Sequence, residues 1–116
     1  MKTMNFKQIS EQYPKAWEKL KFFAGYNIFV KEEKLLYWVE EYKEPYPICN
    51  LYYFFDAVGV VITIEVSYES GVISGFYFMI DAGNSVQNAN GLIYSTRPEA
   101  EEAGFIKAFE ILENKL

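Results

Sequence analysis

Two runs in which apolar and polar residues alternate constrain the fold of this 116-residue chain more than any other feature. In residues 60–68, and again in residues 72–80, apolar side chains recur at almost every second position. This is the period of a β-strand with one buried face. Glu69-Ser70-Gly71 lies between the runs, and its glycine can adopt the positive φ of a tight turn. The sequence therefore predicts an antiparallel hairpin with strands at about 60–68 and 72–81.

A C-terminal helix is predicted over about 97–115. Thr96 and Glu99 have the spacing of a capping box, and Pro98 suits a first helical turn, where its missing amide costs nothing. Apolar residues at helical spacing form one stripe, and a row of small residues on its flank would let another element approach closely. The stripe consists of Phe105, Ala108, Phe109, Leu112 and Leu116, and the flank of Ala100, Gly104 and Ala108.

The segments before the hairpin show the apolar spacing of helices. Pro14 should divide the first segment into helices at about 5–12 and 14–25, because proline removes a hydrogen bond and clashes with the preceding turn. A further helix is expected over about 31–42, where the alternation also fits a strand. After Asn50, which is a good N-cap, one or two helical turns are expected, and a buried strand is the alternative because it would show a similar pattern over so few residues.

The expected fold is a single α+β domain over residues 1–116. N-terminal helices precede a small antiparallel three-stranded sheet, and the C-terminal amphipathic helix covers this sheet. The third strand is placed at about 91–95, after a loop at 82–90 that is rich in glycine, serine and asparagine. The length suits one domain. A content of 51% hydrophobic and 19% aromatic residues is sufficient for one core.

The residue types that are missing exclude most familiar chemistry. The chain has no histidine, which removes the commonest general base, the usual catalytic triads and most zinc sites. Its seven glycines fit neither the P-loop nor the dinucleotide fingerprint. No catalytic activity, cofactor or metal is therefore expected. A carboxylate-based enzyme using Asp56 or Asp81 is an alternative, but both follow apolar segments, where aspartate usually forms turns.

The single cysteine, Cys49, cannot form an internal disulfide. The longest apolar run, 58–62, is far short of a membrane span, and no apolar leader is present near Met1. A cytoplasmic location without a membrane partner is therefore expected. Cys49 could be a small buried hydrophobic residue or, close to a helix start, a reactive thiol.

The net charge of −5 is unevenly distributed. Residues 1–24 carry five lysines against two glutamates, whereas the rest of the chain is strongly acidic. Acidic proteins repel nucleic acid, so nucleic-acid binding is disfavoured. The alternative is that the lysine-rich N-terminal helix contacts a phosphate backbone while tyrosine or tryptophan stacks on bases. Arg97, the only arginine, opposes the helix dipole at a helix start. It could grip an anion or pair with Glu101.

Three short blocks resemble segments of small uncharacterised proteins from bacterial chromosomes, prophages and other mobile elements. They are Tyr13-Pro14-Lys15-Ala16-Trp17, Leu51-Tyr52-Tyr53-Phe54-Phe55-Asp56 and Tyr94-Ser95-Thr96-Arg97-Pro98-Glu99-Ala100-Glu101. The resemblance implies an accessory gene of a bacterium or a phage, and carries over no functional residue.

The favoured hypothesis is a non-enzymatic accessory protein that binds another protein, such as an inhibitor that presents acidic patches to a basic target. The candidate contacts are Arg97, Lys15, Lys19 and Trp38. A homodimer is a further possibility, because an open sheet has edges and the strand 72–80 is apolar on both faces.

Overall fold

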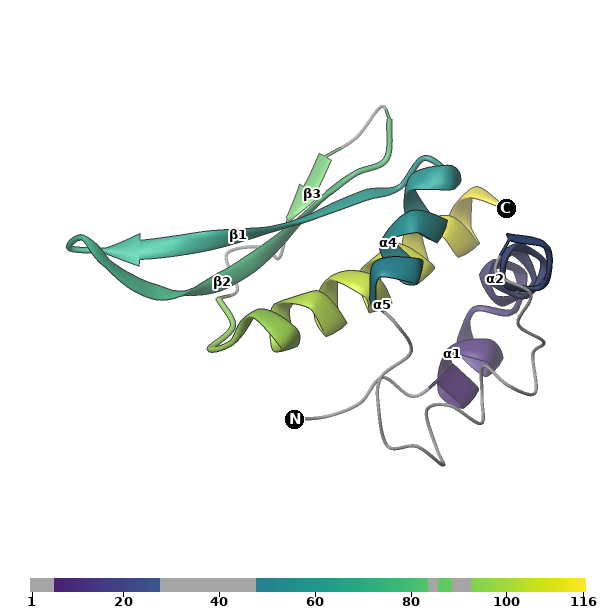
Figure 1. The fold of residues 1–116 in the computed structure, drawn as a ribbon, viewed down its shortest axis with the longest axis horizontal. Coiled ribbons are helices and arrows are strands. Elements are labelled where there is room, and N and C mark those ends of the chain that lie inside the picture. Colours follow the sequence, from purple (N-terminus) through teal and green to yellow (C-terminus); the bar gives the residue numbers. More distant parts are fainter. Residues whose placement is uncertain (1–5, 28–47, 84–85, 89–92) are drawn as a thin grey trace.

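The computed structural model describes residues 6–27, 48–83, 86–88 and 93–116. Helices and a small antiparallel sheet form an α+β fold in which the C-terminal helix α5 packs against one face of the sheet (Figure 1). The elements in chain order are α1 (Phe6–Gln12), α2 (Pro14–Asn27), α4 (Ile48–Ala57), β1 (Val61–Glu69), β2 (Val72–Asp81), β3 (Val86–Asn88) and α5 (Arg97–Lys115).

The N-terminal helices divide at the predicted proline. α1 ends at Gln12 and α2 begins at Pro14, where proline occupies a position that needs no intrahelical amide hydrogen bond. α2 continues to Asn27, two residues beyond the predicted end. The helix expected at 31–42, which contains Trp38, lies outside the described residues.

The helix expected after Asn50 is present, but its start was predicted wrongly. α4 begins at Ile48, so Asn50 is its third residue and not its N-cap. Ile48 and Cys49 can both adopt helical backbone angles, so the helix begins two residues before Asn50. α4 then ends at Ala57, one turn before the sheet begins.

The predicted hairpin is confirmed. β1 and β2 pair antiparallel, with Ile62 opposite Ile80 and Ile64 opposite Phe78 on the face that α5 covers. Between the strands Ser70 and Gly71 have φ values of 53° and 81°. Positive φ at both central residues defines the type I′ turn, whose twist matches that of paired strands.

The third strand differs from the prediction. β3 comprises Val86–Asn88, within the segment expected to be a loop, and pairs with residues 79–81 of β2. Of the predicted strand at 91–95, the described part makes one isolated bridge, between Tyr94 and Phe76, with N–O distances of 2.8 and 2.7 Å. β2 therefore meets two short segments along this edge. Val86–Asn88 has a single apolar residue, so sequence periodicity cannot locate this strand.

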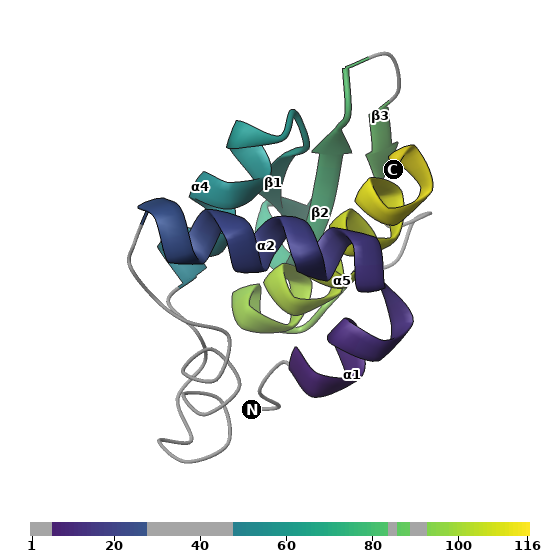
Figure 2. The ribbon, with the colours of Figure 1, turned by 90° about the vertical axis from the view of Figure 1, so that its right-hand side faces the viewer.

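α5 joins the layers of the fold. On one side the small flank faces the sheet, because a Cβ built on Gly104 would lie only 3.1 Å from Cβ of Phe78. On another side α5 packs against α2, which crosses it (Figure 2). A carboxylate oxygen of Glu113 near the end of α5 accepts a hydrogen bond from the backbone N–H of Ala16, at 2.9 Å, in the first turn of α2. The last helix thus caps one of the first helices.

The centre of the molecule is an aromatic cluster between α4 and α5. Phe55 packs edge-on against Phe109, with ring centroids 4.9 Å apart, and stacks on Phe105 at 6.1 Å. All three rings are almost completely buried. Together with Leu20 and Trp17 of α2 and with Ile62, Phe78 and Ile80 of the sheet, they form one continuous core.

The start of α5 confirms Thr96 as the N-cap. The Thr96 hydroxyl accepts a hydrogen bond from the backbone N–H of Glu99 at 3.3 Å, and donates to the Glu99 carboxylate at 3.0 Å. In the expected capping box the carboxylate accepts from the backbone amide of Thr96 instead.

We expect Thr96→Ala to lower the free energy of unfolding by about 1 kcal/mol, measured by urea denaturation. Thr96→Ser retains the hydroxyl and should lie close to the wild type, and an equal loss in both variants would contradict the cap.

Candidate functional site

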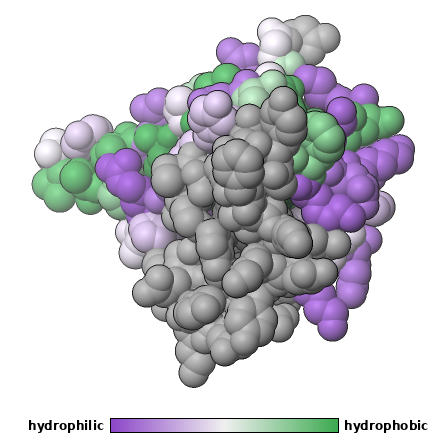
Figure 3. Space-filling model, turned by 45° about the vertical axis from the view of Figure 1, so that its right-hand side comes forward, coloured by the Kyte–Doolittle hydropathy of each residue, from purple (hydrophilic) through white to green (hydrophobic). Residues whose placement is uncertain are grey.

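The hairpin projects beyond the start of α5 and forms an arm (Figure 1). We call residues 65–74 the hairpin arm, and none of them is buried. Tyr68, Val72 and Ile73 are large apolar residues with exposed fractions of 66%, 68% and 55%. Figure 3 shows hydrophobic residues on this projecting end, at the left of the view. An apolar group at the end of a strand pair stabilises nothing in the core, so it is a candidate contact surface.

A β-bulge sets the orientation of the arm. The register shifts between Ser67 and Tyr68, because Ser67 pairs with Gly75 whereas Tyr68 pairs with Ile73. Ser74 is the extra residue, and its hydroxyl donates to the Ser67 carbonyl oxygen at 3.1 Å. A bulge increases the local twist and re-aims the side chains that follow it. Tyr68 and Ile73, as direct cross-strand partners, place their side chains on one face of the arm.

The arm is acidic as well as apolar. It contains Glu65 and Glu69, both exposed, and the sequence has no lysine or arginine between Lys43 and Arg97. Arg97 approaches the sheet next to the arm, with its guanidinium carbon 5.1 Å above the ring centroid of Phe76. This is the geometry of a cation–π contact. The arm therefore offers negative charge and apolar area together.

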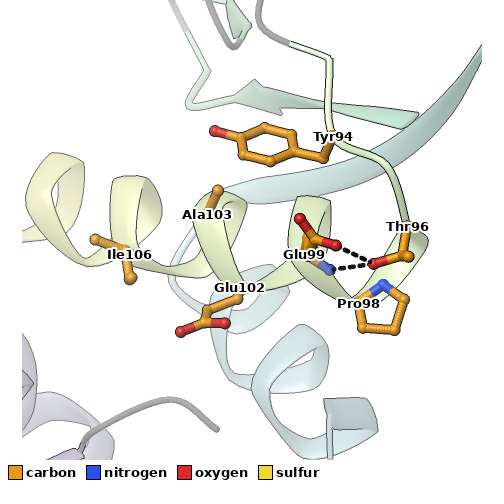
Figure 4. A pocket seen from close by; sticks show the side chains of 7 residues that line it. All are labelled: Tyr94, Thr96, Pro98, Glu99, Glu102, Ala103 and Ile106. Atoms are coloured by element: carbon orange, nitrogen blue, oxygen red, sulfur yellow. Dashed lines mark hydrogen bonds between the residues drawn. The ribbon is translucent and has the colours of Figure 1, made fainter. Parts of the chain in front are cut away.

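A pocket of about 770 Å³ lies beside the start of α5 (Figure 4). The Tyr94 ring lies over Ala103, and the Glu99 carboxylate points towards Thr96, with which it completes the cap. The carboxylate is thus already used to hold the helix start. The other lining residues are Pro98, Glu102 and Ile106.

A second groove, of about 490 Å³, lies at the opposite end of the molecule. Four of its lining residues come from α2 and one is the final residue of the chain. We call it the α2 groove, and it is lined by Lys15, Glu18, Lys19, Phe22 and Leu116.

Tyr52 and Glu101 form a half-buried hydrogen-bonded pair between α4 and α5. The Tyr52 hydroxyl donates to Oε2 of Glu101 at 3.0 Å, and its ring packs edge-on against Phe105. Burial, and then the neighbouring Glu101 charge, raise the pKa of Tyr52 well above its usual 10.0, and Arg97 partly offsets this. The hydroxyl stays protonated at neutral pH, so the pair is a structural contact between two helices.

This pair predicts a difference in alkaline stability. The pKa of Tyr52 is raised on folding. The contribution of its hydroxyl to the free energy of unfolding is therefore fully present below pH 10.0 and is lost as the pH rises above that value. We expect Tyr52→Phe to cost about 1 kcal/mol at pH 7. The difference in the free energy of unfolding between Tyr52→Phe and the wild type should become smaller above pH 10.0. Urea denaturation from pH 7 to pH 11 measures it, with Tyr53→Phe as the exposed control. A constant gap would contradict the assignment.

The predicted contact residues do not form one site. Lys15 and Lys19 lie together in the α2 groove, whereas Arg97 lies at the start of α5 and Trp38 is outside the described residues. In the described part of the chain Arg97 and Glu101 do not pair with each other. Arg97 lies over the Phe76 ring, and Glu101 accepts the hydrogen bond from Tyr52. Sequence analysis missed the arm residues Tyr68, Val72 and Ile73. The signal that could have found them is that the strand 72–80 is apolar on both faces.

The two aspartates are exposed and line neither of these pockets. The Asp81 carboxylate accepts a hydrogen bond from the Gly83 N–H at 2.9 Å, which confirms the predicted turn-forming role of Asp81. Cys49 lies in α4, but its side chain is outside the described part of the structure.

Among the described residues no group of three or more aspartate, glutamate or cysteine side chains is arranged to hold a metal ion. None of the described helices is both long enough and apolar enough to cross a membrane. Comparisons of the chain with protein-family models, with curated proteins and with solved structures each found no match.

Proposed function

We propose that this protein acts without catalysis, by binding another protein through the hairpin arm. The observation that carries the proposal is the exposure of Tyr68, Val72 and Ile73 at the end of a strand pair that projects from the core. Aromatic and branched apolar side chains in such a position supply contact area at low entropic cost when a partner covers them.

The charge of the arm selects the class of partner. Glu65 and Glu69 flank the apolar residues, and no basic residue lies within the arm. Nucleic acids and anionic membranes would be repelled by these carboxylates. A protein surface that combines basic and apolar residues would be attracted. An accessory protein that inhibits a basic target by covering its surface, in the cytoplasm, is the role most consistent with this chemistry.

The test compares two variants of the full chain. The arm variant combines Tyr68→Ser, Val72→Thr and Ile73→Thr, all exposed positions whose replacement leaves the core intact. The matched control is Val61→Thr, an exposed branched residue at the other end of the same strand. Tagged wild type and both variants are used for quantitative affinity purification from a bacterial lysate, and any enriched protein is then purified and titrated directly.

We expect a protein that binds the wild type and Val61→Thr equally and the arm variant at least about 30-fold more weakly, because hot-spot truncations cost 2 kcal/mol or more. Its binding should weaken as salt is raised. Equal binding of the same protein by the arm variant, or a salt-sensitive partner that proves to be nucleic acid, would contradict the proposal. Circular dichroism of both variants checks that each is folded.

A further inference from the structure

The hairpin arm and the α2 groove lie at opposite ends of the molecule (Figures 1 and 2). α5 separates them, since its first residue lies beside the sheet near the arm and Leu116, which follows its last residue, lines the groove. A helix of 19 residues is about 28 Å long. The arm is part of the sheet that packs on α5, so it cannot bend back to the groove of its own chain. A contact between the two features has to join two molecules.

The groove has the chemistry that the arm lacks. Its acidic residue, Glu18, pairs with Lys21 at 2.8 Å on the neighbouring turn. Lys15 and Lys19 make no ion pair with any other described residue, so their positive charge is available to a ligand. Phe22 and Leu116, exposed by 74% and 45%, add apolar area beside the two lysines.

We propose that the α2 groove of one copy of this chain receives the hairpin arm of another copy. The carboxylates of Glu65 and Glu69 face Lys15 and Lys19. Val72, the cross-strand partner of Glu69, lies on the same face of the arm and packs on the apolar part of the groove. The inference rests on the arm being a protein-binding surface, as proposed above, and it names a second copy as its partner. The contact is heterologous, because different surfaces of the two copies meet.

Symmetric pairing through the sheet edge is disfavoured by the same charges. β1 is the outer strand of the sheet. Two β1 strands paired antiparallel about their centre would bring Glu65 of each copy close together, and like charges opposite one another destabilise a strand pair. Such a charge in an edge strand is a common protection against edge pairing. The acidic arm instead favours a surface of opposite sign, which the α2 groove supplies.

The test is sedimentation velocity of the full chain over a wide concentration range, at low salt and at about 0.5 M salt, where surface charges are screened. High protein concentrations are included, because interfaces that bury less than the roughly 1,600 Å² of a standard interface are often weak. The arm variant is the one defined above. The groove variant combines Lys15→Glu and Lys19→Glu. Val61→Thr and Lys7→Glu, an exposed lysine on α1, are the matched controls.

The wild type and both controls should associate with increasing concentration at low salt and dissociate at high salt. Each of the two variants alone should sediment as a single chain. Their mixture should give a species of about twice that mass, because one intact arm then meets one intact groove. Only folded variants can complement each other, so this result also shows that the substitutions did not unfold the chain.

A wild type that stays a single chain at every concentration, a mixture that does not associate, or association that persists in the arm variant would each overturn this inference. The first two results leave the proposed function standing if the arm variant still loses a partner from the lysate. If the arm variant loses no partner of any kind, including its own copy, the proposed function fails as well.

Discussion

Phe55→Ala is expected to lower the free energy of unfolding by about 3–5 kcal/mol, the usual cost of removing a buried phenylalanine ring. Phe55 has no exposed surface, and its ring contacts Phe54, Phe105 and Phe109. Alanine would leave a cavity between α4 and α5 that rigid aromatic neighbours cannot fill. Because domains of this kind are stable by only about 5–15 kcal/mol, this single change should bring the protein close to unfolding at moderate temperature.

Urea denaturation followed by circular dichroism measures the loss. The control is Tyr68→Ala, which removes an aromatic ring of similar size from the exposed arm and should change stability by about 0.5 kcal/mol or less. If the two variants lost similar amounts, the aromatic cluster would not be the centre of the core.

Gly75→Ala is expected to destabilise the protein by about 1–3 kcal/mol, the range for forcing an extra carbon into a packed site. A Cβ at this position would clash with Cγ2 of Ile93 and would lie 2.7 Å from the carbonyl oxygen of Tyr94. That carbonyl accepts a hydrogen bond from the N–H of Phe76 at 2.8 Å. The substitution therefore has to push the Tyr94 backbone away from β2 and break the bridge that leads into α5.

Gly104→Ala is the matched control, because the three atoms nearest to a Cβ there would be side-chain atoms of Phe78 and Ile62, at 3.1–3.4 Å. Alanine also favours a helix interior by up to about 1 kcal/mol. The control should therefore be nearly neutral. Hydrogen exchange of the Phe76 and Tyr94 amides reports on the bridge directly, and unchanged protection of both in Gly75→Ala would disprove the explanation.

The elements that the sequence predicted well are those with strong local signals. Pro14 separates α1 from α2, and the glycine at position 71 closes the hairpin turn. The start of α5 follows from Thr96. In each case a single residue type has few conformations open to it, so local chemistry decides the structure.

The third strand could not be predicted for the opposite reason. Val86–Asn88 has only one apolar residue, and its strand conformation comes from antiparallel pairing with residues 79–81. Strand preference depends more on the neighbour than on the segment itself. Residues 91–95 have the more strand-like composition, but of their described part only Tyr94 bonds to β2.

The candidate site was predicted in part. Lys15 and Lys19 share one side of a helix because they are four residues apart, and the structure places them in one groove. The arm was missed because Tyr68 and Ile73 continue the apolar alternation of strands whose other residues are buried. Alternation alone does not show where α5 begins relative to the sheet. In the structure α5 begins short of the hairpin turn, so the last residues of the hairpin extend past the core (Figure 1).

The hydrogen bond from Ala16 to Glu113 has a consequence for the folding of this protein during its synthesis on the ribosome. α2 obtains a cap from α5, which follows the hairpin in the chain, and both helices contribute to the same core. In a nascent chain that has emerged only as far as the hairpin, Phe55 lacks the Phe105 and Phe109 rings against which it packs. The core should therefore assemble in one late step, once α5 has cleared the exit tunnel, and a chain stalled before that step would be exposed to chaperones and proteases.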